Sequence, residues 1–276
     1  AAHLPGLAMG ETIGAFALSE PDSGSDAGSL QATAERDGDD YVLNGTKFWI
    51  THGGYASIYV VMARTGGPGP RGVSAFLVPG DADGLSFGKK EEKMGLRSSP
   101  TVELVMKNVR IPATNRIGAE GDGFKVAMSA LDSGRITIAA ISVGIAQAAM
   151  DTAAAYATQR VQFNQPIIDF QGVGFMIADM ACQIESSRLL VQKAAALRDA
   201  NRPYSHIAAM AKCVATDASI KVATDAVQVL GGYGYTREYP VERYMRDAKV
   251  MQIVEGTNQV QRVVISRHIK GLYAEM

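Results

Sequence analysis

Residues 121–147, GDGFKVAMSALDSGRITIAAISVGIAQ, decide the fold of the second half of the chain. The large apolar residues of this stretch recur at spacings of three, four and seven: Phe124, Met128, Leu131, Ile138, Ile141 and Ile145. These spacings place them on one face of an α-helix. We therefore expect a long amphipathic helix over about residues 121–160.

Further Ala-rich helical stretches follow, and Pro166, Pro203 and Pro240 fall between them. We predict helices over residues 170–200, 203–230 and 257–272, with a shorter one near 240–249. Four long helices with short connections are typical of an antiparallel four-helix bundle.

The first 118 residues have a different texture, because most of the glycines and prolines of the chain lie there. Short segments rich in β-branched and aromatic residues predict strands over residues 15–19, 31–36, 41–43, 46–51, 58–64, 73–78 and 102–109. Asn44-Gly45 is a strong signal for a two-residue hairpin turn between two of them. With no helices between the strands, we predict an antiparallel barrel-like or sandwich-like domain over 1–118 and a helical domain over 119–276, an α+β fold.

The composition excludes several classes of function. Of the 276 residues, 27 are basic and 28 acidic, so a net charge of −1 gives no electrostatic attraction to nucleic acid. Two cysteines form no disulfide scaffold, and four scattered histidines lack the spacing of a catalytic metal site. No uninterrupted apolar run reaches the length of a membrane span, so none is expected.

Four stretches could carry chemistry, although each has a structural explanation on its own. FALSEPDSGSDAGS (16–29) is a strand followed by a polar turn, and NGTKFWIT (44–51) holds the only tryptophan. Strand alternation places Trp49 and Thr51 on one face and Phe48 and Ile50 on the other, which suits a flat heterocycle or a core. GGPGPRG (66–72) lacks the residues of a phosphate-binding loop and reads as a hairpin connection.

The other two stretches lie in the helical half. QRVQFNQPII (159–168) puts Arg160 at a helix end, where it could bind a phosphate or interact with the helix dipole. QVLGGYGYTREYPVERYMRD (228–247) has clustered glycines, which suit a helix cap or the close approach of a ligand. No strand precedes these glycines and their spacing is not that of a dinucleotide fingerprint, so a Rossmann site is disfavoured.

Taken together and in this order, these stretches resemble the acyl-CoA dehydrogenase family, closest in appearance to its short-chain, butyryl-CoA dehydrogenase-like members. ALSEPDSGSDAGS and QVLGGYGYTREYPVERYMRD resemble its two signatures, and WIT, RVQF, FQGVGFMIADM and IVEGTNQVQR stand at the expected intervals. Asn164 stands at a position where the family often has glycine. Asparagine tolerates the left-handed backbone conformation, so this difference does not weaken the resemblance. The family carries a helical domain ahead of the β domain, so this chain is expected to be a fragment that retains FAD weakly and turns over little.

The resemblance implies FAD and an acyl-CoA thioester, which loses hydrogen from Cα and Cβ to give a trans-2-enoyl-CoA. Glu255 would be the base that removes the α-proton, and its apolar neighbours Ile253 and Val254 would raise its pKa. The Gly256 N–H would polarise the thioester carbonyl. Some relatives place the base at the position of Gly134, where this chain has no carboxylate. This strengthens the assignment of Glu255 as the base.

Other roles carry over by position. The resemblance implies FAD contacts from Leu18, Ser19, Gly24, Ser25, Trp49, Ile50, Thr51, Arg160, Phe163, Gln171, Gln228, Gly231, Gly232, Thr257, Asn258 and Gln259. Substrate contacts would come from Ser25, Asp132, Arg135 and Gly256, and no metal is implied. The FAD contacts of the helical half would cross a subunit boundary, which implies a homodimer or homotetramer.

The electron acceptor, the possibility of a non-catalytic role and the acyl chain length remain open at this stage. The electron acceptor could be an electron-transfer flavoprotein or, in an acyl-CoA oxidase, oxygen. A non-catalytic relative that binds DNA or a partner is opposed by the net charge and by the retained Glu255. A soluble protein of the bacterial cytoplasm or mitochondrial matrix is expected, and the acyl chain length stays open.

Overall fold

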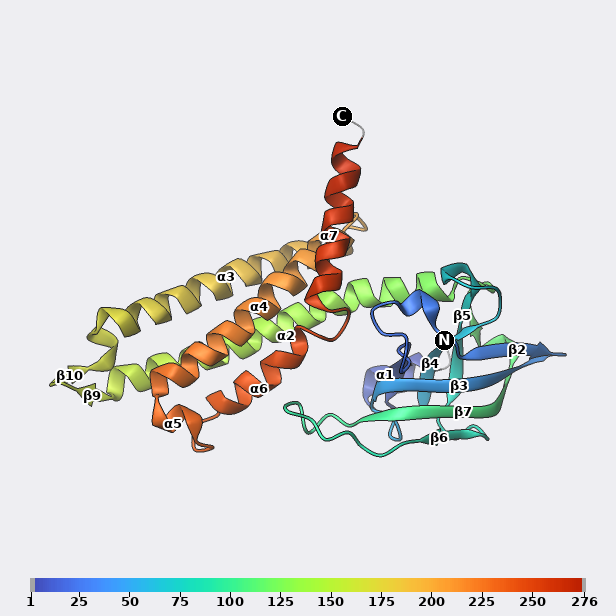
Figure 1. Ribbon diagram of the computed structural model, residues 1–276, viewed down its shortest axis with the longest axis horizontal. Coiled ribbons are helices and arrows are strands. Elements are labelled where there is room, and N and C mark those ends of the chain that lie inside the picture. The colour runs from blue at the N-terminus through green and yellow to red at the C-terminus, as the bar shows by residue number, and fades with distance from the viewer. Residues whose placement is uncertain (1–2, 275–276) are drawn as a thin grey trace. The chain divides into compact units, whose positions relative to one another are not determined.

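The structure is a computed structural model that describes residues 3–274. The chain divides into two compact units, a sheet unit of residues 1–93 and 97–130 and a helical unit of residues 94–96 and 131–276 (Figure 1). The boundary predicted at 118/119 falls just before the long helix that both units share.

The sheet unit holds one short helix, α1 (Leu4–Met9), and an eight-stranded sheet. Its strands are β1 (Gly14–Ala17), β2 (Thr33–Asp37), β3 (Asp40–Thr51), β4 (Ile58–Arg64), β5 (Val73–Pro79), β6 (Leu85–Phe87), β7 (Thr101–Pro112) and β8 (Arg116–Ile117). They run in the order β6-β7-β3-β2-β4-β5-β8, with β1 beside β4. The pairing is mainly antiparallel as predicted, but β1 and β4 are parallel, so the sheet is mixed.

The hairpin predicted at Asn44-Gly45 is wrong. β3 runs straight through both residues and pairs with β7, with only a bulge between Leu43 and Gly45. Gly45 has a φ of +135°, and a Cβ there would stand 2.7 Å from Ala32, so the glycine serves a close approach of chains. The turn lies instead at Gly38, where Asp37 pairs with Asp40.

The helical unit contains the predicted helices as α2 (Gly123–Gln159), α3 (Gln171–Asp199), α4 (Ser205–Leu230), α6 (Val241–Met251) and α7 (Asn258–Tyr273). A two-stranded hairpin, β9 (Val161–Gln162) and β10 (Gln165–Pro166), follows α2, and a single turn, α5 (Gly232–Tyr235), follows α4. The predicted fold class, a β domain followed by a helical domain, is confirmed.

The core of the helical unit is built largely from alanine. Ala139, Ala153, Ala208 and Ala223 are among the fully buried residues from α2 and α4, with Met180 from α3. Small side chains let these helices approach closely, and α3 and α4 run beside α2 in Figure 1. The last predicted bundle helix differs in detail, because α7 stands across the others and its buried residues are the polar Asn258 and Gln261.

One helix is long and apolar enough to meet the length and composition of a membrane span. An 18-residue window of α2 is sufficiently apolar, and 39% of that window is buried inside the structure. The buried side chains of α2 from Ile136 to Ala157 join the core of the bundle. A core helix passes the same test, so this is weak evidence for a membrane.

A buried ion pair ties the sheet unit together below the polar turn that follows β1. Lys47 of β3 is fully buried, and its Nζ donates to Glu20 Oε1 (2.8 Å) and to Leu18 O (3.1 Å). The Glu20 carboxylate also accepts from the N–H groups of Gln31 (2.6 Å) and Ala32 (2.9 Å). Burial lowers the pKa of Lys47, and the Glu20 charge opposes that shift. The pair thus fixes both ends of the turn of residues 18–30.

We predict that Lys47→Met destabilises the sheet unit by about 3 kcal/mol or more, because it leaves a buried carboxylate without its counter-charge. Urea unfolding measures the change. The double variant Glu20→Gln/Lys47→Met, which removes both charges, should be more stable than Lys47→Met alone. Equal stability of the wild type and Lys47→Met would contradict the role of the pair.

Candidate active site

Glu255 lies in a tight turn between α6 and α7. Its φ is +55° and that of Gly256 is +85°, so two successive residues take left-handed backbone. α7 starts directly afterwards, and its N-cap Thr257 accepts a hydrogen bond from Val260 N (3.2 Å). A left-handed glutamate costs free energy, which indicates that the surrounding contacts impose the turn.

The Glu255 carboxylate is partly buried and accepts no hydrogen bond from the residues that the structure describes. Burial raises its pKa, while the charges of Arg135 and Lys212 oppose the rise. The burial does not come from its sequence neighbours as predicted, because the side chains of Ile253 and Val254 are exposed. It comes from the fold, which places the carboxylate against α2.

Gly134 of α2 provides the room for this carboxylate. A Cβ at position 134 would stand 2.5 Å from Glu255 Oε2 and 2.8 Å from its Cδ. Real Cβ atoms do not approach so closely, so any larger residue would displace the carboxylate. The absence of a side chain at 134 is therefore a requirement of the position that Glu255 occupies.

Asp132 and Arg135 lie beside the same turn. Arg135 is buried, pairs with Asp132 (Nη1–Oδ1 2.6 Å) and approaches the Glu255 carbonyl oxygen (3.4 Å). Asp132 also accepts from Ser205 Oγ (2.9 Å). Both were predicted to line the path of CoA, but their side chains are engaged within the protein, which favours a supporting role for Arg135.

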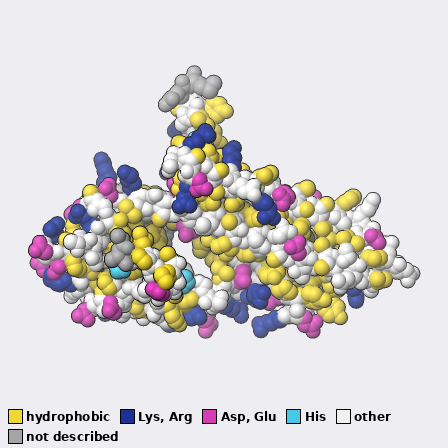
Figure 2. Space-filling view, turned by 180° about the vertical axis from the view of Figure 1, so that it is seen from behind, with side chains coloured by type: hydrophobic (Ala, Val, Ile, Leu, Met, Phe, Trp, Pro, Cys, Tyr) yellow, Lys and Arg dark blue, Asp and Glu magenta, His cyan; other side chains and the backbone are white. Residues whose placement is uncertain are grey.

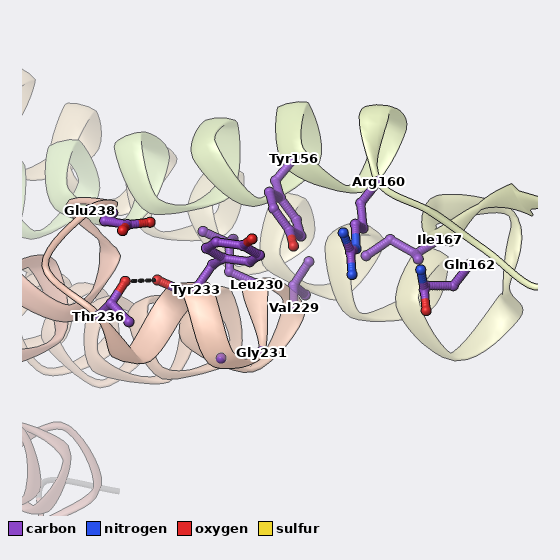
Figure 3. Close-up of a pocket in the computed structure, with 11 residues that line it drawn as sticks. Tyr156, Arg160, Gln162, Ile167, Val229, Leu230, Gly231, Tyr233, Thr236 and Glu238 are labelled. Carbon is purple, nitrogen blue, oxygen red and sulfur yellow. Dashed lines mark hydrogen bonds between the residues drawn. The ribbon is translucent and has the colours of Figure 1, made fainter.

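A second cluster of residues, which includes Arg160, lines a cavity of about 550 Å³. Figure 3 shows Tyr156 and Arg160 at the end of α2, facing Leu230, Gly231 and Tyr233 of the α4–α5 junction. Among the described residues, no hydrogen-bond acceptor or carboxylate pairs with the Arg160 guanidinium. It is free to bind an anion, although Glu238 also lines the cavity.

Other predicted cofactor contacts of the helical unit are exposed, as is Asn164 beside Phe163. Phe163 is 88% exposed with a φ of +51°, and Asn164 takes a left-handed φ of +63°. Gln171, Gln228 and Gly232 are also exposed. An 88% exposed phenylalanine suits a contact with another molecule rather than a core position.

The two clusters lie far apart on one chain. Asp132 and Arg160 are separated along α2 by about 40 Å, at roughly 1.5 Å per residue. This exceeds the reach of a single dinucleotide. If both clusters bind FAD, they do not bind the same molecule.

The sheet unit groups the predicted residues of the polar turn and of β3. Phe48 N donates to Ser19 O (2.8 Å), which joins the start of the turn to the strand that carries Trp49. Gly24 and Ser25 are exposed at the turn. Leu18 and Ile50 are buried, so only their backbone groups can face a ligand.

Trp49 is not a core residue. It is 60% exposed with a φ of +63°, and a register shift interrupts β3 between Lys47 and Ile50. This bulge breaks the predicted strict alternation, because Lys47 and Ile50 both point inward. Trp49 and Thr51, which were predicted to share a face, are both exposed, and an exposed indole beside a hydroxyl suits a planar heterocycle.

One predicted cofactor contact, Asn258, has its side chain engaged within the protein. The Asn258 side chain is buried, with Nδ2 donating to Asp217 Oδ1 (2.7 Å) and Thr216 Oγ1 (2.9 Å). Its Oδ1 accepts from Lys212 Nζ (2.9 Å). The side chain is thus committed to the junction of α4 and α7, whereas Thr257 and Gln259 keep more exposure.

The sequence analysis did not identify several buried polar residues that lie in or beside the sites, among them Glu20, Lys47, Lys212 and Gln261. A lysine within an apolar strand or helix was the available signal, because charged groups are rarely buried without partners. Burial lowers the pKa of Lys212 to about 8. Among the described residues, no group of three or more metal-ligating side chains occurs.

Comparison with known proteins assigns both halves of the chain. The sequence model described as "Acyl-CoA dehydrogenase, middle domain" matches residues 15–109, and that described as "Acyl-CoA dehydrogenase, C-terminal domain" matches residues 121–270. The chain belongs to the acyl-CoA dehydrogenase family. Members are flavoprotein oxidoreductases of fatty-acid metabolism, and a tetramer is typical of them.

Two relatives illustrate the similarity. An acyl-CoA dehydrogenase of Bacillus subtilis is 52% identical over 270 residues, which are 98% of this chain and 71% of the relative. The mitochondrial isobutyryl-CoA dehydrogenase of Dictyostelium discoideum is 50% identical over 268 residues, which are 96% of this chain and 64% of the relative.

Solved structures agree. Butyryl-CoA dehydrogenase from Megasphaera elsdenii superposes with a TM-score of 0.96 at 48% identity, covering 97% of this chain and 70% of that one. A chain from work on the electron transferring flavoprotein of Acidaminococcus fermentans and flavin-based electron bifurcation matches with a TM-score of 0.96 at 50% identity, covering 97% and 71%.

For this acyl-CoA dehydrogenase, we predict that Gly134→Ala lowers dehydrogenation of acyl-CoA at least about tenfold, because the new Cβ displaces the Glu255 carboxylate. Thermal stability should rise or stay unchanged, because alanine favours the interior of a helix. Gly144→Ala is the matched control, since a Cβ at 144 in the same helix meets nothing within 4 Å. Equal losses of activity in both variants would contradict the explanation.

Proposed function

We propose that this protein removes the α-proton and the β-hydride of a short-chain or branched short-chain acyl-CoA and forms a trans-2-enoyl-CoA. The observation that carries the proposal is the Glu255 turn, which combines a partly buried carboxylate of raised pKa with an adjacent free backbone N–H. A carboxylate without a hydrogen-bond donor is a stronger base than a solvated one.

Glu255 is proposed as the base. Its carboxylate takes the proton from Cα, and the electron pair of the C–H bond enters the Cα–Cβ bond as the β-hydride leaves. Dispersal of the developing charge onto the thioester oxygen lowers the barrier. The Gly256 N–H donates to none of the described residues, so it is available to that oxygen.

The residues present fit FAD. Bound FAD would supply the acceptor for the hydride from Cβ. The exposed Trp49 and Thr51 offer an aromatic face and a hydroxyl, and the unpaired Arg160 guanidinium offers two N–H donors to a phosphate. Thr257 and Gln259 stand at the start of α7, where backbone N–H groups favour anionic partners.

Relatives guide the finer points of the proposal. The names of the Dictyostelium and Megasphaera enzymes specify isobutyryl-CoA and butyryl-CoA, which supports a short acyl chain. The Acidaminococcus neighbour supports an electron-transferring flavoprotein as acceptor. An acyl-CoA oxidase would instead pass electrons to oxygen, so turnover with and without air separates the two. A bacterial cytoplasm or mitochondrial matrix is the proposed location.

We predict that Glu255→Gln retains acyl-CoA and FAD but lowers the rate of flavin reduction by about 100- to 10,000-fold, the usual contribution of a general base. Stopped-flow bleaching of the flavin by butanoyl-CoA under anaerobic conditions measures this rate. A near wild-type rate in the variant would exclude Glu255 as the base.

The pH dependence tests the same assignment. Glu255 accepts a proton only when ionised, so the reduction rate should rise with pH through its pKa. Because burial raises this pKa above the ordinary 4.5, the acid limb should lie above that value. Glu255→Gln should lose the limb, and an acid limb retained by the variant would assign it to another group.

Two copies of the chain are proposed to share each FAD. The separation of about 40 Å between Asp132, beside the Glu255 turn, and Arg160 supports an Arg160 cluster that serves a cofactor other than the one at Thr257. Hydrophobic side chains are exposed on the helical unit (Figure 2), and such side chains suit a covered surface. The exposed large apolar residues of this unit include Phe163, Phe175, Leu189 and Tyr235.

We predict that Arg160→Ala weakens FAD binding about 10- to 100-fold, because it removes charge-assisted hydrogen bonds to phosphate. Flavin release on dilution measures the affinity. Arg198→Ala is the control, since Arg198 is an exposed arginine in the last turn of α3 outside the cavity. A sedimenting monomer with fully retained FAD would contradict the shared site.

A further inference from the structure

Glu255 stands at the centre of a closed loop, residues 252–258, that joins α6 to α7. Gln252 is the C-cap of α6, and Asn258 is the first residue of α7. The two ends of the loop meet, because Asn258 N donates to Gln252 O (3.0 Å). The conformation of a loop that is closed in this way depends on how its two ends are held.

A carboxylate from another helix binds both ends of this loop. Asp217 of α4 accepts with Oδ1 from Gln252 Nε2 (2.6 Å) and from Asn258 Nδ2 (2.7 Å). Its Oδ2 accepts from Arg262 Nη2 of α7 (3.0 Å). Among the residues that the structure describes, no other side chain forms hydrogen bonds with the side chains of both Gln252 and Asn258. Asp217 therefore joins the end of α6 to the start of α7.

The Glu255 carboxylate has little else to hold it. It accepts no hydrogen bond from the described residues, so its position follows from the backbone of the loop and from packing. The backbone of Glu255 has a φ of +55°, which a glutamate keeps only when the surrounding contacts impose it. The packing is tight, since a Cβ at Gly134 would stand 2.5 Å from Glu255 Oε2. A small movement of the loop would therefore displace the carboxylate from its place beside α2.

We propose that Asp217 is a positioning residue, which holds the loop of residues 252–258 closed and so keeps the Glu255 carboxylate where it takes the α-proton. The inference rests on the proposed dehydrogenation and deepens it. Asp217 binds the chain on either side of Glu255 and acts on the base only through the loop. It touches none of the reacting atoms.

The positioning role requires one acceptor oxygen of Asp217 and not its charge. Gln252 and Asn258 are neutral amides, and both donate to Oδ1. The ion pair between Oδ2 and Arg262 contributes little, because 57% of the Arg262 side chain is exposed. Asparagine at position 217 offers the same acceptor oxygen and gives up only this exposed pair, whereas alanine removes the acceptor.

The test compares Asp217→Ala and Asp217→Asn with the wild type, each as FAD-loaded protein. In Asp217→Ala the limiting rate of flavin reduction by butanoyl-CoA should fall about 10- to 100-fold, as for a slightly misplaced catalytic group, with little change in KM. Asp217→Asn should restore most of the rate. Asp225→Ala is the matched control, since Asp225 lies on the same helix and pairs with Lys221 of that helix.

A second readout does not depend on turnover. Hydrogen exchange followed by mass spectrometry measures the opening of the loop. The Asn258 N–H is protected by Gln252 O, so the peptide that contains residues 252–258 should exchange faster in Asp217→Ala than in the wild type. Exchange of this peptide should stay unchanged in Asp217→Asn and Asp225→Ala. A general loss of stability would instead speed exchange in the core of α4 as well.

Gln252→Met keeps the inference testable if Asp217→Ala does not fold. It removes one of the two donors to Oδ1, so the rate should fall in the same direction by a smaller amount. The double variant Asp217→Ala/Gln252→Met should lose no more than Asp217→Ala alone, because both changes break the same contact.

A wild-type limiting rate in folded Asp217→Ala, or in Gln252→Met if Asp217→Ala does not fold, would overturn the positioning role. An equal loss of rate in Asp217→Ala and Asp217→Asn would also overturn it, because asparagine keeps the acceptor oxygen. Absence of flavin reduction in the wild type would instead overturn the proposed function, so the two failures are distinguishable.

Discussion

The peptide group between Glu255 and Gly256 is the constraint on which the candidate site of the helical unit depends. Its carbonyl accepts a hydrogen bond from Gln261, while its N–H donates to none of the described residues. Three helices contribute to the turn, since Arg135 lies on α2, Lys212 on α4 and Gln261 on α7. The turn therefore exists only when these helices are packed, which makes its geometry a product of tertiary structure.

The same turn shows a conflict between stability and chemistry. Left-handed backbone at Glu255, an unsatisfied Gln261 oxygen and a partly buried carboxylate each cost free energy. An ordinary helix connection would avoid all three. Their concentration in a few residues is typical of functional sites, where strained groups persist because the surrounding fold over-determines them.

In the sheet unit, a buried ion pair holds the turn that carries predicted site residues. The turn of residues 18–30 is rich in small polar residues, which favour turns. Lys47 and Glu20 form hydrogen bonds to the backbone at the two ends of this turn. The bulge that turns Lys47 and Ile50 inward also leaves Trp49 exposed. One irregularity of β3 thus positions both the buried anchor and the exposed indole.

The sequence by itself determined the helices, most strands and the family. The helical period and the separating prolines are local properties, so the predicted bounds of α2, α3, α4 and α7 lie within a few residues of those observed. The prediction failed where distant chain segments compete with local preference. Asn44-Gly45 favours a turn locally, but pairing with β7 and the approach of Ala32 keep it in a strand.

Only the tertiary structure decided the environment of Glu255. The sequence placed it between apolar neighbours, yet Ile253 and Val254 are exposed and do not bury it. Its raised pKa, the space at Gly134 and the hydrogen bonds from Gln261 and Lys212 come from residues on other helices or a turn away. Periodicity is readable along a chain because it is set by neighbouring residues, whereas desolvation depends on which segments meet after folding.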